Sequence, residues 1–202
     1  MVTVRQIEKL WKDESYGRLL RGLLANRPEA SIRVEAELPI SPVTAAAMAM
    51  VRLDELSQSH VALYQKLLHR VLAKQESDGG WGDPMTTALC LRALLCSNGD
   101  GAAIERGLGY LANLQKSDGA WPAVPFRRMP ADGFASAFIL CQLGNIARFR
   151  DAVDFDALLN WFSRNESGLT FDAGRLWDVA RLRCRGAIAL RVRRAEPMLT
   201  WS

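Results

Sequence analysis

Two aspartates are the best candidates for acid–base chemistry in this chain. Asp83 and Asp132 each stand just before a segment of small and apolar residues, PMTTALCLRALLCS and GFASAFILCQLG. A carboxylate at the start of a helix accepts backbone N–H bonds and matches the helix dipole, so both residues are first interpreted as helix caps. If such a helix start borders a cavity, the same carboxyl group can donate a proton when its surroundings keep it protonated. Asp178, in LWDVARL, is a third candidate.

Histidine and cysteine offer no metal or redox chemistry at recognisable spacing. The two histidines, His60 and His69, belong to one amphipathic stretch, and a zinc site would need further ligands beside them. The four cysteines show neither CxxC pairing nor metal-ligand spacing, which indicates reduced, buried thiols. We therefore expect no metal, no cofactor and a cytoplasmic location.

The composition is that of a soluble globular protein. Of 202 residues, 49% are hydrophobic and 24% are charged, and no apolar run reaches the roughly 18–20 residues of a membrane span. The N-terminus lacks the apolar core of a signal peptide. The net charge is +4, and much of the positive charge, which arginine mostly supplies, lies in a basic segment at 175–194. This segment has no nucleic-acid motif, so we expect no nucleic-acid partner; a solvated helix face is the first interpretation, and peripheral membrane contact is the alternative.

A repeated turn motif determines how these residues are placed. The pattern Gln, three residues, Gly, one residue, Trp occurs at Gln75–Trp81 and again at Gln115–Trp121, 40 residues later. An amphipathic helix is predicted before each copy, and a nearly apolar helix after it. Pro at the first helical turn, as at Pro42 and Pro84, marks the start of such an apolar helix. A degenerate third copy of the motif runs through Asn165, Gly168 and Phe171.

The repeats predict an all-α chain of about four helical hairpins in a single domain, residues 1–202. Their boundaries are roughly 1–58, 59–98, 99–148 and 149–195. The difference between amphipathic and apolar helices predicts two layers, with the apolar helices inside. Closing such hairpins gives a small or partial α/α toroid, and an open stack is the alternative.

The repeated turns resemble those of the terpenoid cyclase and protein prenyltransferase superfamily. The segment RGLGYLANLQKSDGAW at 106–121 resembles a complete QW motif of squalene–hopene cyclases, and residues 75–81 match its C-terminal half. The resemblance implies structural roles for four residues, whose amide and indole groups would join helix ends. These residues are Gln75, Trp81, Gln115 and Trp121.

The same resemblance tests the acid chemistry. The family places a DxDD motif before an inner helix and uses its middle aspartate as the proton donor. Here Asp83 and Asp132 match the first aspartate, whereas Met85 and Phe134 occupy the middle position. Any acid catalysis is therefore assigned to Asp83 or Asp132. Substrate-binding residues are expected on the inner helices, and they are Met85, Phe134, Phe138 and Trp177.

These observations lead to one main hypothesis and two alternatives. The main hypothesis is a small cyclase-like protein that binds a hydrophobic isoprenoid or polyene in a central cavity and cyclises it by acid catalysis. The first alternative is a non-catalytic module that binds lipid or protein. The second is a cyclase acting on a non-terpenoid polyene or polyketide. Because four hairpins make a tight ring, a homodimer is a candidate assembly.

Overall fold

Residues 41–96 and 100–184 are described by the computed structural model, and within these ranges the chain is helical, without a strand. The chain divides into two units, Met1–Pro42 and Val43–Ser202, and the described helices belong to the second from Val43 onward. The predicted first half of the first hairpin and the end of the basic segment lie outside the described residues. The helices are α3 (Pro42–Glu55), α4 (Ala62–Leu72), α5 (Pro84–Cys96), α6 (Gly101–Leu114), α7 (Gly133–Leu143), α8 (Ala147–Ala152), α9 (Phe155–Asn165), the 3₁₀ turn η1 (Glu166–Gly168) and α10 (Phe171–Arg183).

Several of the helices begin where the sequence offers a side-chain cap. Asp100, Asp132 and Asp154 each accept a backbone N–H from the first turn of α6, α7 and α9. Thr170 does the same for α10. The prolines Pro42 and Pro84 are the first residues of α3 and α5, as predicted. Short polar side chains at these points satisfy N–H groups that have no partner inside the helix.

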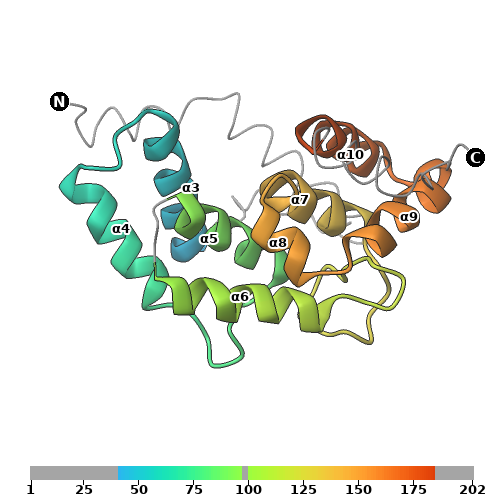
Figure 1. Cartoon of the computed structure of the whole chain (residues 1–202), viewed down its shortest axis with the longest axis horizontal. Helices are drawn as coiled ribbons and strands as arrows, with labels where there is room; N and C mark the ends of the chain where they lie inside the picture. Colours follow the sequence, from blue (N-terminus) through green and yellow to red (C-terminus); the bar gives the residue numbers. More distant parts are fainter. Residues whose placement is uncertain (1–40, 97–99, 185–202) are drawn as a thin grey trace, which may run out of the picture. The chain divides into compact units, whose positions relative to one another are not determined.

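Two kinds of helix alternate along the chain. Most residues of α5 and α7 are buried, as expected for helices without a polar face. By contrast, α4 and α9 bury one side only. The apolar α5 packs against α6 and α7, and α7 packs against α10. Figure 1 shows α4, α6 and α9 following one side of this unit, with α3, α5, α7 and α10 beside them.

Side-chain contacts indicate how the helices that follow the turns lie beside one another. The hydroxyls of Thr44 and Thr86, in the first turns of α3 and α5, are 3.3 Å apart. At the other end of the row, Gly133 at the start of α7 faces Ala173 at the start of α10. The Arg183 guanidinium donates to the Cys141 carbonyl at the ends of the same two helices, at 2.9 Å. Contacts at both ends therefore show that α7 and α10 run in the same direction, whereas α3 and α5 lie side by side at their first turns.

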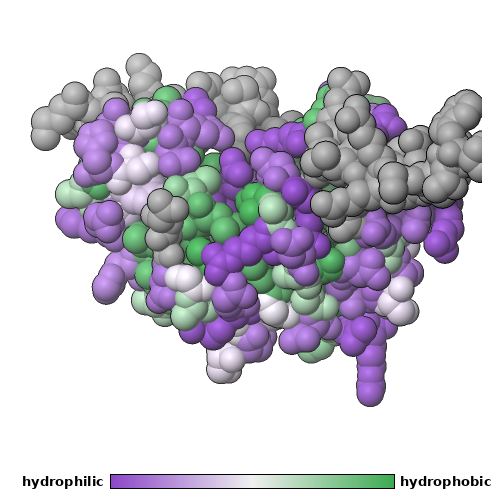
Figure 2. Space-filling model, in the orientation of Figure 1, coloured by the Kyte–Doolittle hydropathy of each residue, from purple (hydrophilic) through white to green (hydrophobic). Residues whose placement is uncertain are grey.

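The core lies between the two layers. Its largest fully buried side chains include Trp121, Phe149, Phe155 and Phe162. The Trp121 and Phe149 rings are 6.1 Å apart, and the Phe162 and Trp177 rings stack at 4.2 Å. Figure 2 shows apolar side chains gathered over α5 on the face in view, with hydrophilic side chains on the surrounding helices. None of the described helices is long and apolar enough to cross a membrane.

Candidate functional site

The two complete turn motifs have the same backbone geometry. Gly79 and Gly119 have φ angles of +92° and +94°, which favour glycine over residues with a Cβ. A Cβ on Gly79 would overlap the carbonyl group of Arg106 in α6, and one on Gly119 would overlap the backbone of Ala157 in α9. Each position therefore requires glycine for two reasons: the backbone conformation and the close approach to the next outer helix.

Each motif glutamine joins its turn to the next outer helix in the chain, which is α6 for Gln75 and α9 for Gln115. Gln115 Nε2 donates to the carbonyls of Gly119 (2.8 Å) and Asp154 (3.0 Å), and its Oε1 accepts from the Asp154 N–H (2.8 Å). Gln75 Nε2 donates to the carbonyls of Gly79 (2.9 Å) and Ala103 (2.8 Å). Gln75 Oε1 accepts from Arg106 instead of a backbone amide. One planar side-chain amide thus forms hydrogen bonds both with its own turn and with the next outer helix.

Each motif tryptophan joins its turn to the outer helix that precedes it in the chain. The Trp81 indole N–H donates to the Val71 carbonyl at 2.8 Å, and that of Trp121 donates to the Leu111 carbonyl at 2.7 Å. Both acceptors lie in the last turn of the preceding outer helix. Trp81 and Trp121 are 3% and 0% exposed. Their indoles are part of the helix packing and are not available to a ligand.

Asp83 is engaged at both carboxylate oxygens. Oδ1 accepts the backbone N–H groups of Met85 and Thr86, each at 2.9 Å. Oδ2 accepts the Thr86 hydroxyl at 2.6 Å. Three hydrogen bonds in one turn make Asp83 a strong cap of α5, and its accepting capacity is largely used there.

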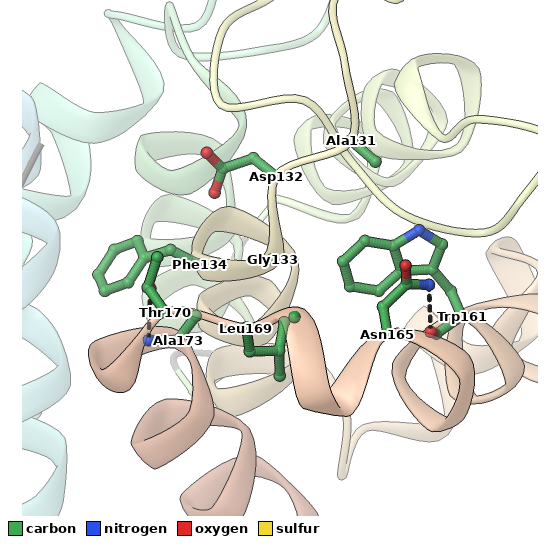
Figure 3. A pocket seen from close by; sticks show the side chains of 10 residues that line it. Ala131, Asp132, Gly133, Phe134, Trp161, Asn165, Leu169, Thr170 and Ala173 are labelled. Atoms are coloured by element: carbon green, nitrogen blue, oxygen red, sulfur yellow. Dashed lines mark hydrogen bonds between the residues drawn. The ribbon is translucent and has the colours of Figure 1, made fainter. Parts of the chain in front are cut away.

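Asp132 has the same place in the next repeat but different surroundings. Its Oδ1 accepts the Ala135 N–H at 2.8 Å, and no bond from Oδ2 to another described residue is present. Asp132 lines a pocket of about 240 Å³ between the starts of α7 and α10 and the end of α9. Figure 3 shows Phe134 and Thr170 on one side of this pocket, Trp161 and Asn165 on the other, and Leu169 between them. The pocket combines aromatic and apolar walls with a carboxylate, an amide and a hydroxyl.

The structure separates the other predicted residues from this pocket. Phe134 lines it, but Met85, Phe138 and Trp177 do not. Phe138 and Trp177 are each 7% exposed, and Trp177 is stacked on Phe162. Met85 is half-buried in the first turn of α5. Asp178 is exposed and pairs with Arg181 at 3.1 Å, so this third acid candidate is part of the surface.

The third turn explains why the pocket contains residues that the sequence did not indicate. Its aligned tryptophan position is Phe171, which is 76% exposed and therefore does not fill the space that Trp81 and Trp121 fill. Asn165, at the glutamine position, donates to the Trp161 carbonyl in its own helix at 2.8 Å. A Cβ on Gly168 would meet no atom within 4 Å. The replacement of the motif residues at the third turn is the sequence feature that could have indicated an open site.

Burial acts on the thiol of Cys90 and the phenol of Tyr110. It raises the pKa of the Cys90 thiol well above its usual range, with a smaller contribution from Asp83. Burial raises the pKa of Tyr110 to about 12, and the charges of Asp78, Asp83 and Glu76 act in the same direction. Both groups stay protonated near neutral pH, so Cys90 is not a nucleophile. Among the described residues, no group of three or more His, Cys, Asp or Glu could hold a metal ion.

The chain was compared with protein-family models, curated proteins and solved structures. No family model matches it, and neither of the other two comparisons gives a significant match. The resemblance of the repeated turns to QW motifs therefore stays a prediction from sequence.

Proposed function

We propose that this chain binds an apolar ligand of the isoprenoid or polyene class in the pocket beside Asp132, on a helical array that forms part of an α/α toroid. The observation that carries the proposal is that Asp132 and Phe134 line one cavity. Both residues come from the start of the same inner helix, α7. The parallel packing of α7 against α10 supports the toroid, and the four free cysteines support a cytoplasmic location.

The size of the pocket limits the ligand. A volume of about 240 Å³ lies below the roughly 300–1,000 Å³ of typical small-molecule pockets. The pocket is therefore suited to one end of a long polyene or to a short isoprenoid. Trp161, Phe134 and Leu169 supply apolar contact, and the faces of the two aromatic rings can stabilise positive charge that develops on a ligand.

Asp132 is the residue that we assign to acid catalysis. Its Oδ1 is held by the Ala135 N–H, which fixes the carboxyl group at the pocket edge. Its Oδ2 is the oxygen from which a proton would pass to an alkene carbon, leaving a carbocation on the ligand and a carboxylate on Asp132. Asp83 is the weaker candidate because both of its oxygens hold the first turn of α5.

The experiment is incubation of the full chain with prenyl diphosphates, squalene and shorter polyenes, followed by product analysis and by titration of tryptophan fluorescence. Asp132→Asn is expected to abolish turnover while keeping the helix cap and ligand binding. Asp83→Asn is the matched control, and it is expected to retain turnover. Phe134→Ala should weaken binding at least about tenfold, because a buried aromatic contact is lost, whereas Phe171→Ala on the exposed surface should not. Equal loss in both aspartate variants, or no binding by wild type, would refute the assignment.

Binding without turnover is the second candidate function. The observation that favours it is that Phe134, which occupies the middle position of the family's acid motif, lines the pocket as an apolar wall. A phenyl ring cannot donate a proton. This candidate predicts fluorescence changes with polyenes, sensitivity to Phe134→Ala, and unchanged substrate after long incubation.

A further inference from the structure

The segment between Trp121 and α7 is an insertion that the first repeat lacks. Residues 122–131 separate Trp121 from Asp132, whereas Gly82 alone separates Trp81 from Asp83. Figure 1 shows this segment as the yellow loop that runs outside the helices between α6 and α7. Because one residue is enough to connect an outer helix to an inner one, the insertion must have a role other than connection.

The loop is held at its base and along one side. The Asp132 N–H donates to the Trp121 carbonyl at 2.8 Å, which brings the two ends together. The Lys116 ammonium donates to the carbonyls of Arg127 (3.4 Å) and Met129 (3.1 Å). Two short backbone bonds, from Phe126 to Val124 and from Met129 to Phe126, shape the tip. Because Lys116 binds the backbone of the tip, the neighbouring side chains are left to face solvent.

The tip combines apolar and cationic side chains. Every residue from 125 to 130 is exposed. Phe126 is 66% and Met129 is 46% exposed, and Arg127 and Arg128 lie between them. No carboxylate among the described residues pairs with either arginine. Exposed apolar side chains next to cations that no carboxylate neutralises match the interface of an anionic bilayer.

We propose that the loop 122–131 attaches this protein to the surface of a membrane that contains anionic lipid. Phe126 and Met129 enter the boundary between headgroups and acyl chains, and Arg127 and Arg128 contact the lipid phosphates. The loop leads directly into Ala131 and Asp132 at the pocket. Attachment would therefore bring the pocket close to a bilayer, although the proposal does not depend on what the pocket binds.

The chemistry of the tip favours a bilayer over a macromolecular partner. Two apolar side chains and two arginines are far fewer than the roughly 20–30 residues that one partner contributes to a stable protein interface. Recognition of single-stranded nucleic acid uses several stacked aromatic rings in a basic groove, and this tip offers Phe126 alone. A bilayer needs no shape complementarity, and each arginine near an anionic surface adds an independent attraction.

A second exposed pair of the same residue types serves as an internal control. Phe171 is 76% exposed at the start of α10, and the Arg175 guanidinium lies over its ring at 5.6 Å. The ring and the cation thus already contact each other, and the pair belongs to a helix instead of a projecting loop. If exposed aromatic and arginine residues bound membranes regardless of their setting, this pair would contribute as much as the loop.

The test is flotation of the full chain with vesicles of phosphatidylcholine alone or mixed with phosphatidylglycerol. Wild type should float with the anionic vesicles and much less with the neutral ones. Arg127→Gln with Arg128→Gln should weaken binding about 30-fold, from about 1 kcal/mol per arginine. Phe126→Ser with Met129→Ser should weaken binding at least about tenfold. Phe171→Ser with Arg175→Gln should leave it unchanged, and about 1 M salt should reduce it.

Three results would overturn the proposal. These are absence of wild-type flotation, equal binding to both vesicle types, and loop variants that bind like wild type. In the last case attachment lies elsewhere, and the basic C-terminal segment is the next place to test. Circular dichroism should show unchanged helix content in the loop variants, because all four substituted side chains are exposed. Capture of a protein or RNA by the loop, without vesicle binding, would also count against the membrane assignment.

Discussion

The two helix-starting aspartates lie at two corners of the molecule, the first corner at Asp83 and the second at Asp132. Both aspartates follow a Gln/Trp turn motif, but different residues surround them. At the first corner, Asp83 makes three hydrogen bonds, and Tyr110 from the next outer helix packs against Gly80 with 8% of its surface exposed. At the second corner, Asp132 makes one bond to the Ala135 N–H, and the residue aligned with Tyr110 is Trp161. This tryptophan is only half-buried and lines the pocket.

The motif contacts and the pocket are therefore separate features of the repeat. Gln and Trp join one outer helix to the turn and the turn to the next helix in both complete copies. The pocket is lined instead by residues that come after the second motif in the chain. At the second corner, an inserted loop and an outward-facing Phe171 replace the close contacts of the first. Departures from the repeat therefore mark the site better than the repeat itself.

The largest expected effect tests whether the two turns are equivalent. Gly79→Ala and Gly119→Ala should each destabilise the protein by about 3–5 kcal/mol, from backbone strain at positive φ together with overlap against the next outer helix. Gly109→Ala is the matched control. Its Cβ would meet nothing within 4 Å, so alanine should raise helix stability by about 1 kcal/mol. Urea unfolding followed by circular dichroism measures all three variants.

The two turns are not equivalent if only one of them tolerates alanine. Tolerance at Gly119 alone would mean that the contact with α9 relaxes, so that the second turn is not a copy of the first. A variant that fails to fold agrees with the prediction, provided that the Gly109→Ala protein folds normally.

A smaller effect separates the two glutamines. Gln115 is 6% exposed and satisfies both the N–H and the carbonyl of Asp154, so Gln115→Ala should cost about 2–4 kcal/mol. Gln75 is half-buried, and its oxygen accepts only from exposed Arg106, which water can solvate instead. Gln75→Ala should therefore cost about 1–2 kcal/mol. Equal losses in urea unfolding would show that the first turn is as well shielded from solvent as the second.

The sequence was sufficient to predict the helix starts at Pro42, Pro84 and Asp132, and the all-α class, because caps and apolar periodicity are local signals. It did not indicate α8, since six residues are too few to show a period. The pocket was predicted only through Asp132 and Phe134. Trp161 in α9 and Leu169 before α10 join them because both lie against Gly133 at the start of α7, and such contacts cannot be inferred from spacing along one helix.

The smallest expected effect concerns the phenol that distinguishes the first corner. The hydroxyl of Tyr110 is buried and has no hydrogen-bond partner among the described residues. Tyr110→Phe should thus change stability at neutral pH by no more than about 1 kcal/mol, in the stabilising direction, because an unsatisfied polar group is removed. The Tyr110 pKa is raised to about 12 from an ordinary value of 10.0, first by burial and then by the charges of Asp78, Asp83 and Glu76.

The pH dependence follows from the direction of that shift. A raised pKa means that the unfolded chain loses this proton near pH 10, before the folded protein does. The contribution of Tyr110 to stability is therefore complete below pH 10 and is lost as the pH rises towards 12. Tyr110→Phe should gain on wild type over this range in urea unfolding, while Trp161→Phe, at the corner without a phenol, should show no such gain. A pH-independent difference between Tyr110→Phe and wild type would mean that this hydroxyl is solvated, and that the first corner is as open as the second.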